Sequence, residues 1–187
     1  MRMQFLELTI IQETGWHTSN NILHKLKIAL LSYRSAPFSG GQGIFVKELS
    51  NALLKRGHEI DIISGPPMPI LEPGIKLIKL EGLNLFETFS FRDRLLKLWN
   101  KKDKDFLDYY DFFKTLIGGF PEMYSFGERA KKHLSQKKDY DIVIDNQSLS
   151  SGMLEIQKNY PFVEIIHHPI TKDFKYDLIY SNGYIQR

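Results

Sequence analysis

The sequence predicts an α/β fold built around a doubly wound parallel sheet, and three observations carry this prediction. Short apolar runs of strand length recur along the chain, and segments with a helical apolar period separate them. The runs lack polar alternation, which is typical of strands that helices bury on both faces. The composition, with 42% hydrophobic and 25% charged residues over 187 residues, is that of one ordinary globular domain.

The first half of the chain supplies three strands and one helix. KIALLSY at residues 27–33 predicts a central strand, and a glycine-rich turn follows it. Residues 44–56 place their apolar side chains on one helical face, and Gly57 ends that helix. HEIDIIS at 58–64 and the shorter run at 74–80 predict two more strands. A strand, a helix and a strand in this order form a βαβ unit with a right-handed crossover.

The second half continues the alternation. A helical period runs through residues 95–117, and Pro121 opens a further helix. YDIVID at 140–145 predicts a fourth strand, residues 148–158 a helix, and FVEIIHH at 162–168 the last strand. Strands that alternate with helices in this way predict a Rossmann-like layout.

The aromatic and charged stretch at residues 91–117 has two interpretations. It is either an amphipathic segment that lies on a membrane or a helical cover over the sheet, and the second is favoured. The chain contains no signal peptide and no run of ~18 uninterrupted apolar residues, so no helix is expected to span a membrane. We therefore expect a cytoplasmic protein whose contact with an anionic membrane, if any, is weak and peripheral.

Composition excludes several classes of protein. The chain has no cysteine, which excludes disulfide scaffolds, zinc–cysteine sites and thiol nucleophiles and agrees with a reducing compartment. The formal net charge is only 25 − 22 = +3. Because the basic residues are not concentrated on an aromatic face, nucleic acid is not expected as a partner.

The glycine-rich turn at residues 35–43 is the first candidate site. Ligands of a parallel sheet bind beyond the carboxyl ends of its strands, and this turn lies there. Gly40, Gly41 and Gly43 would let the backbone approach a phosphate at the start of the following helix, although they equally suit a tight turn. Neither a dinucleotide-binding fingerprint nor a P-loop is present, so a nicotinamide-dependent oxidoreductase and a P-loop NTPase are disfavoured.

Polar residues follow the last two predicted strands. Asn146 and Gln147 carry donors and acceptors that can bind sugar hydroxyls, whereas Asp145 or Ser148 could simply cap the next helix. After the last strand come His167 and His168, which would face opposite sides of an extended strand and therefore not share a metal. One of them is expected to act in the cleft as a hydrogen-bond donor or acid–base group, together with Thr171 and Asp173 further along the chain.

Two Asp-x-Asp tripeptides, at residues 103–105 and 139–141, have the form of a metal-binding motif. Such tripeptides arise easily by chance, and the second one precedes its strand, at the wrong edge of the sheet. No metal site and no cofactor is therefore expected.

Three segments together resemble the N-terminal half of a family 4 glycosyltransferase of the GT-B architecture. They are KIALLSYRSAPFSGGQGIFVKELSNALLKRGHEIDIIS, DYDIVIDNQSLSSGML and FVEIIHHPITKD, which cover most of residues 27–173. The DNQSL and HHPIT segments resemble a bacterial-type subset of that family. The resemblance implies an acceptor-side domain at residues 27–187, preceded by an extension at 1–26. It also implies a nucleotide sugar as donor and an acceptor of unknown identity, with no metal.

The resemblance also implies roles for individual residues. Gly40 and Gly41 match the loop whose backbone nears the donor diphosphate, and His167 or His168 matches the histidine near the transferred sugar. Asn146 and Gln147 match polar positions at the cleft edge, where an acceptor role is expected.

The chain departs from the family in its length. The second domain of the family supplies an Arg/Lys pair and two glutamates seven residues apart, and no glutamate pair with that spacing occurs here. We therefore expect a chain that lacks the donor-binding domain, is inactive by itself, and transfers a glycosyl group when a separate C-terminal domain completes the cleft. The alternative is a non-catalytic α/β module that binds a partner or a small ligand.

Overall fold

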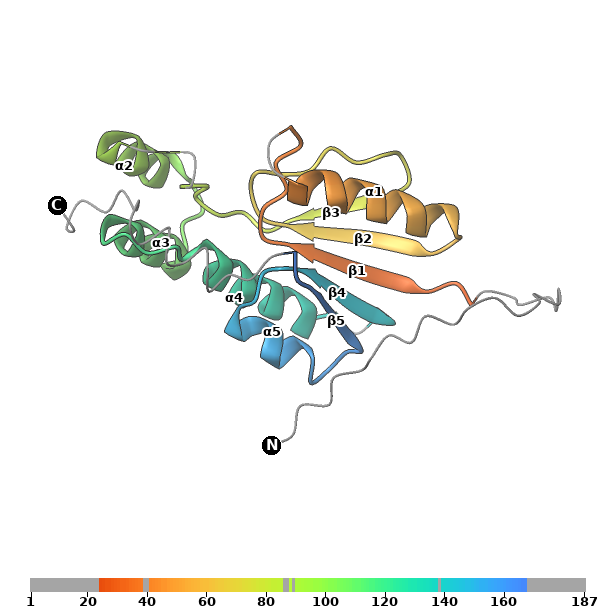
Figure 1. Ribbon diagram of the computed structural model, residues 1–187. Coiled ribbons are helices and arrows are strands. Elements are labelled where there is room, and N and C mark those ends of the chain that lie inside the picture. Colours follow the sequence, from red (N-terminus) through yellow and green to blue (C-terminus); the bar gives the residue numbers. More distant parts are fainter. Residues whose placement is uncertain (1–23, 39–40, 86–87, 89, 138, 168–187) are drawn as a thin grey trace, which may run out of the picture.

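The computed structural model describes residues 24–38, 41–85, 88, 90–137 and 139–167. Within these residues, a five-stranded sheet has the order β3-β2-β1-β4-β5, and all neighbouring strands are parallel (Figure 1). The α/β fold with a doubly wound parallel sheet is therefore confirmed, with the predicted first strand at its centre. The strands are β1 (Lys27–Ser32), β2 (Glu59–Ser64), β3 (Lys76–Lys79), β4 (Ile142–Asn146) and β5 (Phe162–Ile165).

The central strand faces two helical layers. Ile28 and Leu30 of β1 pack with Val46 of α1 (Gly41–Lys55) on one face of the sheet. Ala29 and Leu31 join the core formed with α4 (Glu122–Ser135) and α5 (Ser151–Ile156) on the other face (Figure 1). These four β1 side chains are at most 3% exposed. Successive strand residues point to opposite faces, so an uninterrupted apolar run was needed to fill both layers.

The helices α2 (Phe91–Asn100) and α3 (Phe106–Leu116) stand beyond the carboxyl ends of the strands (Figure 1). They pack on each other, and α3 packs on α4. A small separate core of Leu83, Leu85, Leu98 and Phe112 holds this pair together. The favoured interpretation of residues 91–117 as a cover over the sheet is therefore wrong. Helical periodicity reveals an apolar face but not the surface on which it packs.

Most elements begin or end within a few residues of the predicted positions, and two of the differences bear on the site. The helix α1 begins at Gly41 rather than at residue 44, because the glycines of the turn already take up helical backbone. The strand β5 ends at Ile165 and does not reach the histidines, because the amide of His167 donates to the side chain of Gln147 instead of a neighbouring strand. Residues 1–23 of the predicted extension lie outside the described residues. No helix within the described residues is long and apolar enough to cross a membrane.

Candidate functional site

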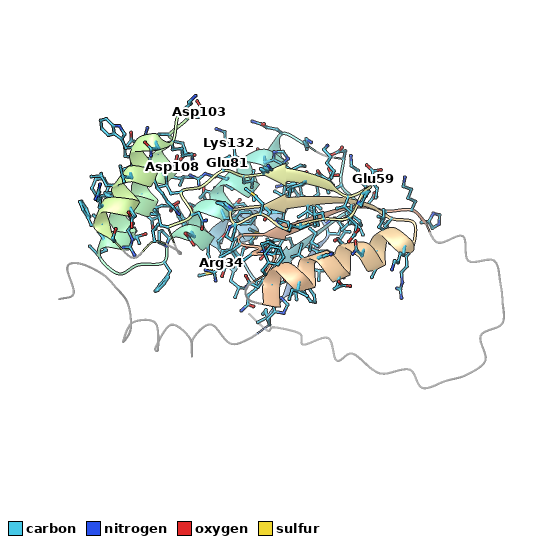
Figure 2. All side chains as sticks on the ribbon, turned by 90° about the horizontal axis from the view of Figure 1, so that it is seen from above. Arg34, Glu59, Glu81, Asp103, Asp108 and Lys132 are labelled. Atoms are coloured by element: carbon cyan, nitrogen blue, oxygen red, sulfur yellow. The ribbon has the colours of Figure 1, made fainter. Side chains whose placement is uncertain are left out.

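The candidate site lies where the carboxyl ends of the strands meet the start of α1 (Figure 1). Arg34 follows β1 at this edge, whereas Glu59 marks the opposite, amino edge of the sheet (Figure 2). The unpaired amide groups and partial positive charge of a helix start suit an anionic ligand. An open parallel sheet also binds its ligands at this edge.

A buried chain of hydroxyl and amide groups crosses this edge. Ser32 and Ser64 end β1 and β2 and are partners in register. The Ser35 hydroxyl donates to Ser32 Oγ at 2.7 Å, and the Ser64 hydroxyl donates to the carbonyl of Gly65 at 2.9 Å. From β4, the side-chain amide of Asn146 donates to Ser32 Oγ at 3.4 Å. These serines are fully buried, so the network fixes the orientation of the Asn146 carboxamide.

The site brings His167 together with Asn146 and Gln147. The ring nitrogen Nε2 of His167 lies 2.6 Å from Asn146 Oδ1, and the backbone amide of His167 donates to Gln147 Oε1 at 3.1 Å. The ring of Phe45 on α1 meets the imidazole edge-on, with 4.7 Å between the ring centroids. In the tautomer that carries its proton on Nε2, the imidazole donates to Asn146, and Nδ1 is the nitrogen that can accept from a ligand.

The two described glycines of the turn have different surroundings. A Cβ atom on Gly43 would lie 2.1 Å from the carbonyl oxygen of Ala36, so only glycine lets the loop after β1 run this close to α1. A Cβ atom on Gly41 would have no neighbour within 4 Å. Gly43 therefore has a packing role, whereas Gly41 lies at the open start of the helix. Gly40 is outside the described residues.

Neither Asp145 nor Ser148 caps the following helix. The backbone amide and the hydroxyl of Ser148 both donate to the Asp145 carboxylate, each at 2.7 Å, and this closes the turn after β4. The N-cap residue of α5 is Ser150, whose side chain makes no capping bond. The turn places Gln147 in the left-handed region, with φ 58°. Its amide group is thereby brought to the backbone of His167.

A carboxyl pair lies beside this turn. Asp145 and Glu164 are partners in the register of β4 and β5. Burial raises the pKa of both groups, and the neighbouring Asp145 further raises the pKa of Glu164, to about 9. One carboxyl group of the pair therefore keeps its proton at neutral pH, because two negative charges on neighbouring buried side chains would repel each other.

Each of the two Asp-x-Asp tripeptides contains an aspartate that stabilises the fold. Asp139 forms an ion pair with Lys27 at the amino edge of the sheet. Asp105 caps α3 through a capping box with Asp108 and also accepts from Arg129. In the described part of the chain, no three acidic or histidine side chains are grouped so that they could hold a metal ion. His168, Thr171 and Asp173 lie outside that part.

Sequence reasoning did not identify Ser32, Ser64 or Phe45 as parts of the site, whereas Ser35 lies in the predicted glycine-rich turn. The available signal was that Ser32 and Ser64 end equivalent parallel strands, which places both hydroxyls at the binding edge. No comparable signal existed for Phe45, because an aromatic residue on an amphipathic helix is usually part of the core.

Two comparisons relate this chain to known proteins. The family model of Glycosyltransferase Family 4 matches residues 39–186. The MMP alpha-(1->4)-mannosyltransferase of Mycolicibacterium hassiacum is 40% identical over 153 residues, which are 79% of this chain. The matched part is 36% of that relative, so the chain spans about a third of its length.

Proposed function

The chain belongs to glycosyltransferase family 4, and on that premise we propose that it forms the acceptor-side half of an enzyme that transfers a glycosyl group from a nucleotide sugar. The observation that carries the proposal is the contact of His167 with Asn146 at the carboxyl edge, held by the buried serines beside the start of α1. The name of the relative supports a mannosyl group as the group transferred.

In the proposed reaction the domain positions the reactants and stabilises the departing diphosphate. The backbone at Gly40 and Gly41 and the amides of the first turn of α1 would face the diphosphate, whose negative charge grows as the glycosidic bond breaks. The His167 imidazole would form a hydrogen bond with the transferred sugar, while Asn146 holds its ring in place. Gln147 would contact the acceptor, and Thr171 and Asp173 remain predicted acceptor residues. The proposal assigns no metal ion or cofactor to these steps.

We also propose that a separate C-terminal domain completes the site. A nucleotide-sugar pocket needs two walls, and in the proposed enzyme the carboxyl edge of this sheet forms one of them. By itself the chain is expected to bind substrates weakly and to turn over none. A non-catalytic binding module is the alternative function, and it would bind its ligand without a second domain.

Measurement of nucleoside diphosphate release tests this proposal. The chain would be assayed alone and fused to the part of the M. hassiacum relative that follows the matched segment, with GDP-mannose as donor and methyl α-D-mannopyranoside as acceptor. We expect turnover by the fused protein, called the joined protein below, and none by the chain alone. A joined protein that folds but releases no diphosphate with GDP-mannose or UDP-glucose would favour the binding module instead.

We further propose a weak peripheral contact with membranes through exposed aromatic side chains of α2 and α3. Trp99, Phe106 and Phe113 are 78%, 80% and 62% exposed there, and the exposed Arg92 and Lys102 accompany them. Aromatic side chains with nearby cations suit the interface of an anionic bilayer. Co-sedimentation with phosphatidylserine vesicles is expected to fall several-fold in the W99S/F106S variant. Equal sedimentation of the variant and the wild type would contradict this contact.

A further inference from the structure

A second polar pocket opens at the same edge of the sheet, next to the α2–α3 pair. Tyr33, which follows β1, and Gly65, which follows β2, form one side, and Asn84, Asp111 and Arg129 lie on the other. The cavity measures about 20 Å³, which is enough for one water molecule or one hydroxyl group. None of the roles proposed above uses these residues, except that Arg129 pairs with the cap of α3.

The pocket contains hydrogen-bond acceptors that have no donor. Asp111 is 2% exposed, and its Oδ2 accepts from the Ser125 hydroxyl at 2.9 Å. Its other oxygen, Oδ1, is buried and has no hydrogen-bond partner among the described residues, and the same holds for the Oδ1 atom of Asn84. Burial raises the pKa of Asp111 to about 7, which agrees with a carboxylate that receives too few hydrogen bonds. Buried acceptors of this kind are normally satisfied, so these two are positioned for a donor from outside the chain.

The charge of the pocket argues against an anionic ligand. The guanidinium of Arg129 is already engaged, because its Nη2 donates to Asp105 at 2.8 Å and to Asp108 at 3.0 Å. Its Nη1 lies 3.8 Å from Asp111 Oδ2. Glu122 adds a further carboxyl group to the pocket lining. A phosphate or carboxylate would therefore meet acceptors and one neutralised cation, whereas a neutral hydroxyl group could donate its proton to an unpartnered oxygen.

We infer that this pocket is an acceptor subsite in which a hydroxyl group of a neutral, polyhydroxylated saccharide donates to Asp111 Oδ1. The inference rests on the proposed transferase function and extends it, because it names residues and a ligand chemistry for the acceptor. The Asn84 carboxamide supplies a second acceptor for a neighbouring hydroxyl group. The pocket lies at the same carboxyl edge of the sheet as His167, since Tyr33 and Gly65 follow β1 and β2.

The test measures binding of methyl α-D-mannopyranoside to the 187-residue chain by titration in ¹H–¹⁵N spectra. In Asp111→Asn the amide oxygen is expected to accept the hydrogen bond that the Ser125 hydroxyl donates. The NH₂ group, which is a donor, then takes the place of the acceptor Oδ1. At pH 8, where most of Asp111 is ionised although burial raises its pKa to about 7, we expect binding at least tenfold weaker, which is the effect of losing a hydrogen bond to a charged group. The matched control is Asp103→Asn, at an exposed position between α2 and α3 (Figure 2), and it should bind like the wild type.

A second variant keeps the test decisive if Asp111→Asn disturbs the fold. Asn84→Gly removes the unpartnered carboxamide and retains the left-handed backbone, since Asn84 has φ 49°. It should also weaken saccharide binding. No saturable binding, binding unchanged in both variants, or preferential binding of inorganic phosphate would overturn the inference. Turnover by the joined protein is measured in a separate assay. If the joined protein turns over its substrates while Asp111→Asn binds the saccharide as the wild type does, the subsite is refuted and the transferase function is retained.

Discussion

In the joined protein, His167→Ala is expected to lower kcat/KM for GDP-mannose about 100-fold, because the hydrogen bond from the transferred sugar to Nδ1 would be lost and the sugar would no longer be aligned. The structure gives the reason, because Asn146 Oδ1 at 2.6 Å and the Phe45 ring hold this imidazole in one orientation. Steady-state assays of diphosphate release measure the loss.

The matched control is His58→Ala at the opposite edge of the sheet, where the ring accepts from the amide of Leu26. It should keep the activity of the wild type. A His167→Ala protein that folds normally and loses less than about threefold in kcat/KM would show that the imidazole does not act on the transition state.

Replacement of Gly43 by alanine is expected to lower the free energy of unfolding by about 3 kcal/mol, the upper part of the usual range for overpacking. The added Cβ would lie 2.1 Å from the carbonyl oxygen of Ala36, and two backbone segments would have to separate. Urea unfolding of the chain, followed by circular dichroism, measures the change.

Gly41→Ala is the control within the same helical turn, because its Cβ would have no neighbour within 4 Å. Its stability should equal or slightly exceed that of the wild type, since alanine favours helix. In the joined protein it should instead raise the KM for the donor, because the methyl group would project where the diphosphate is proposed to bind. Equal stability of both variants would contradict the packing role of Gly43.

The strands could be predicted because strands that are buried on both faces appear in the sequence as short apolar runs. Each inner strand must fill two helical layers, so every residue of β1 and β2 after the first is buried, and most of these buried residues are apolar. The candidate site followed from this, because parallel strands bring the residues after β4 and β5 to one edge. Asn146, Gln147 and His167 were predicted from that rule and are in contact in the structure.

Other features could not be predicted because they depend on which surfaces meet. The period of residues 91–117 reveals an apolar face, but the face packs between α2 and α3 and not on the sheet. The acceptor pocket is built from segments distant in sequence, among them Tyr33, Asn84 and Asp111. An isolated aspartate on a helix normally lies in solvent, so only the tertiary structure identifies Asp111 as buried.

The central claim is that the carboxyl edge of the sheet forms one wall of the sugar-transfer cleft. Amide chemical shifts of the joined protein, recorded with and without GDP-mannose, test it most directly. The account predicts that the shifts within this half change at the first turn of α1 and at Asn146, Gln147 and His167. Lys27 and Asp141, at the amino edge, should be unaffected. Changes confined to the amino edge, or none in this half while the second domain responds, would contradict it.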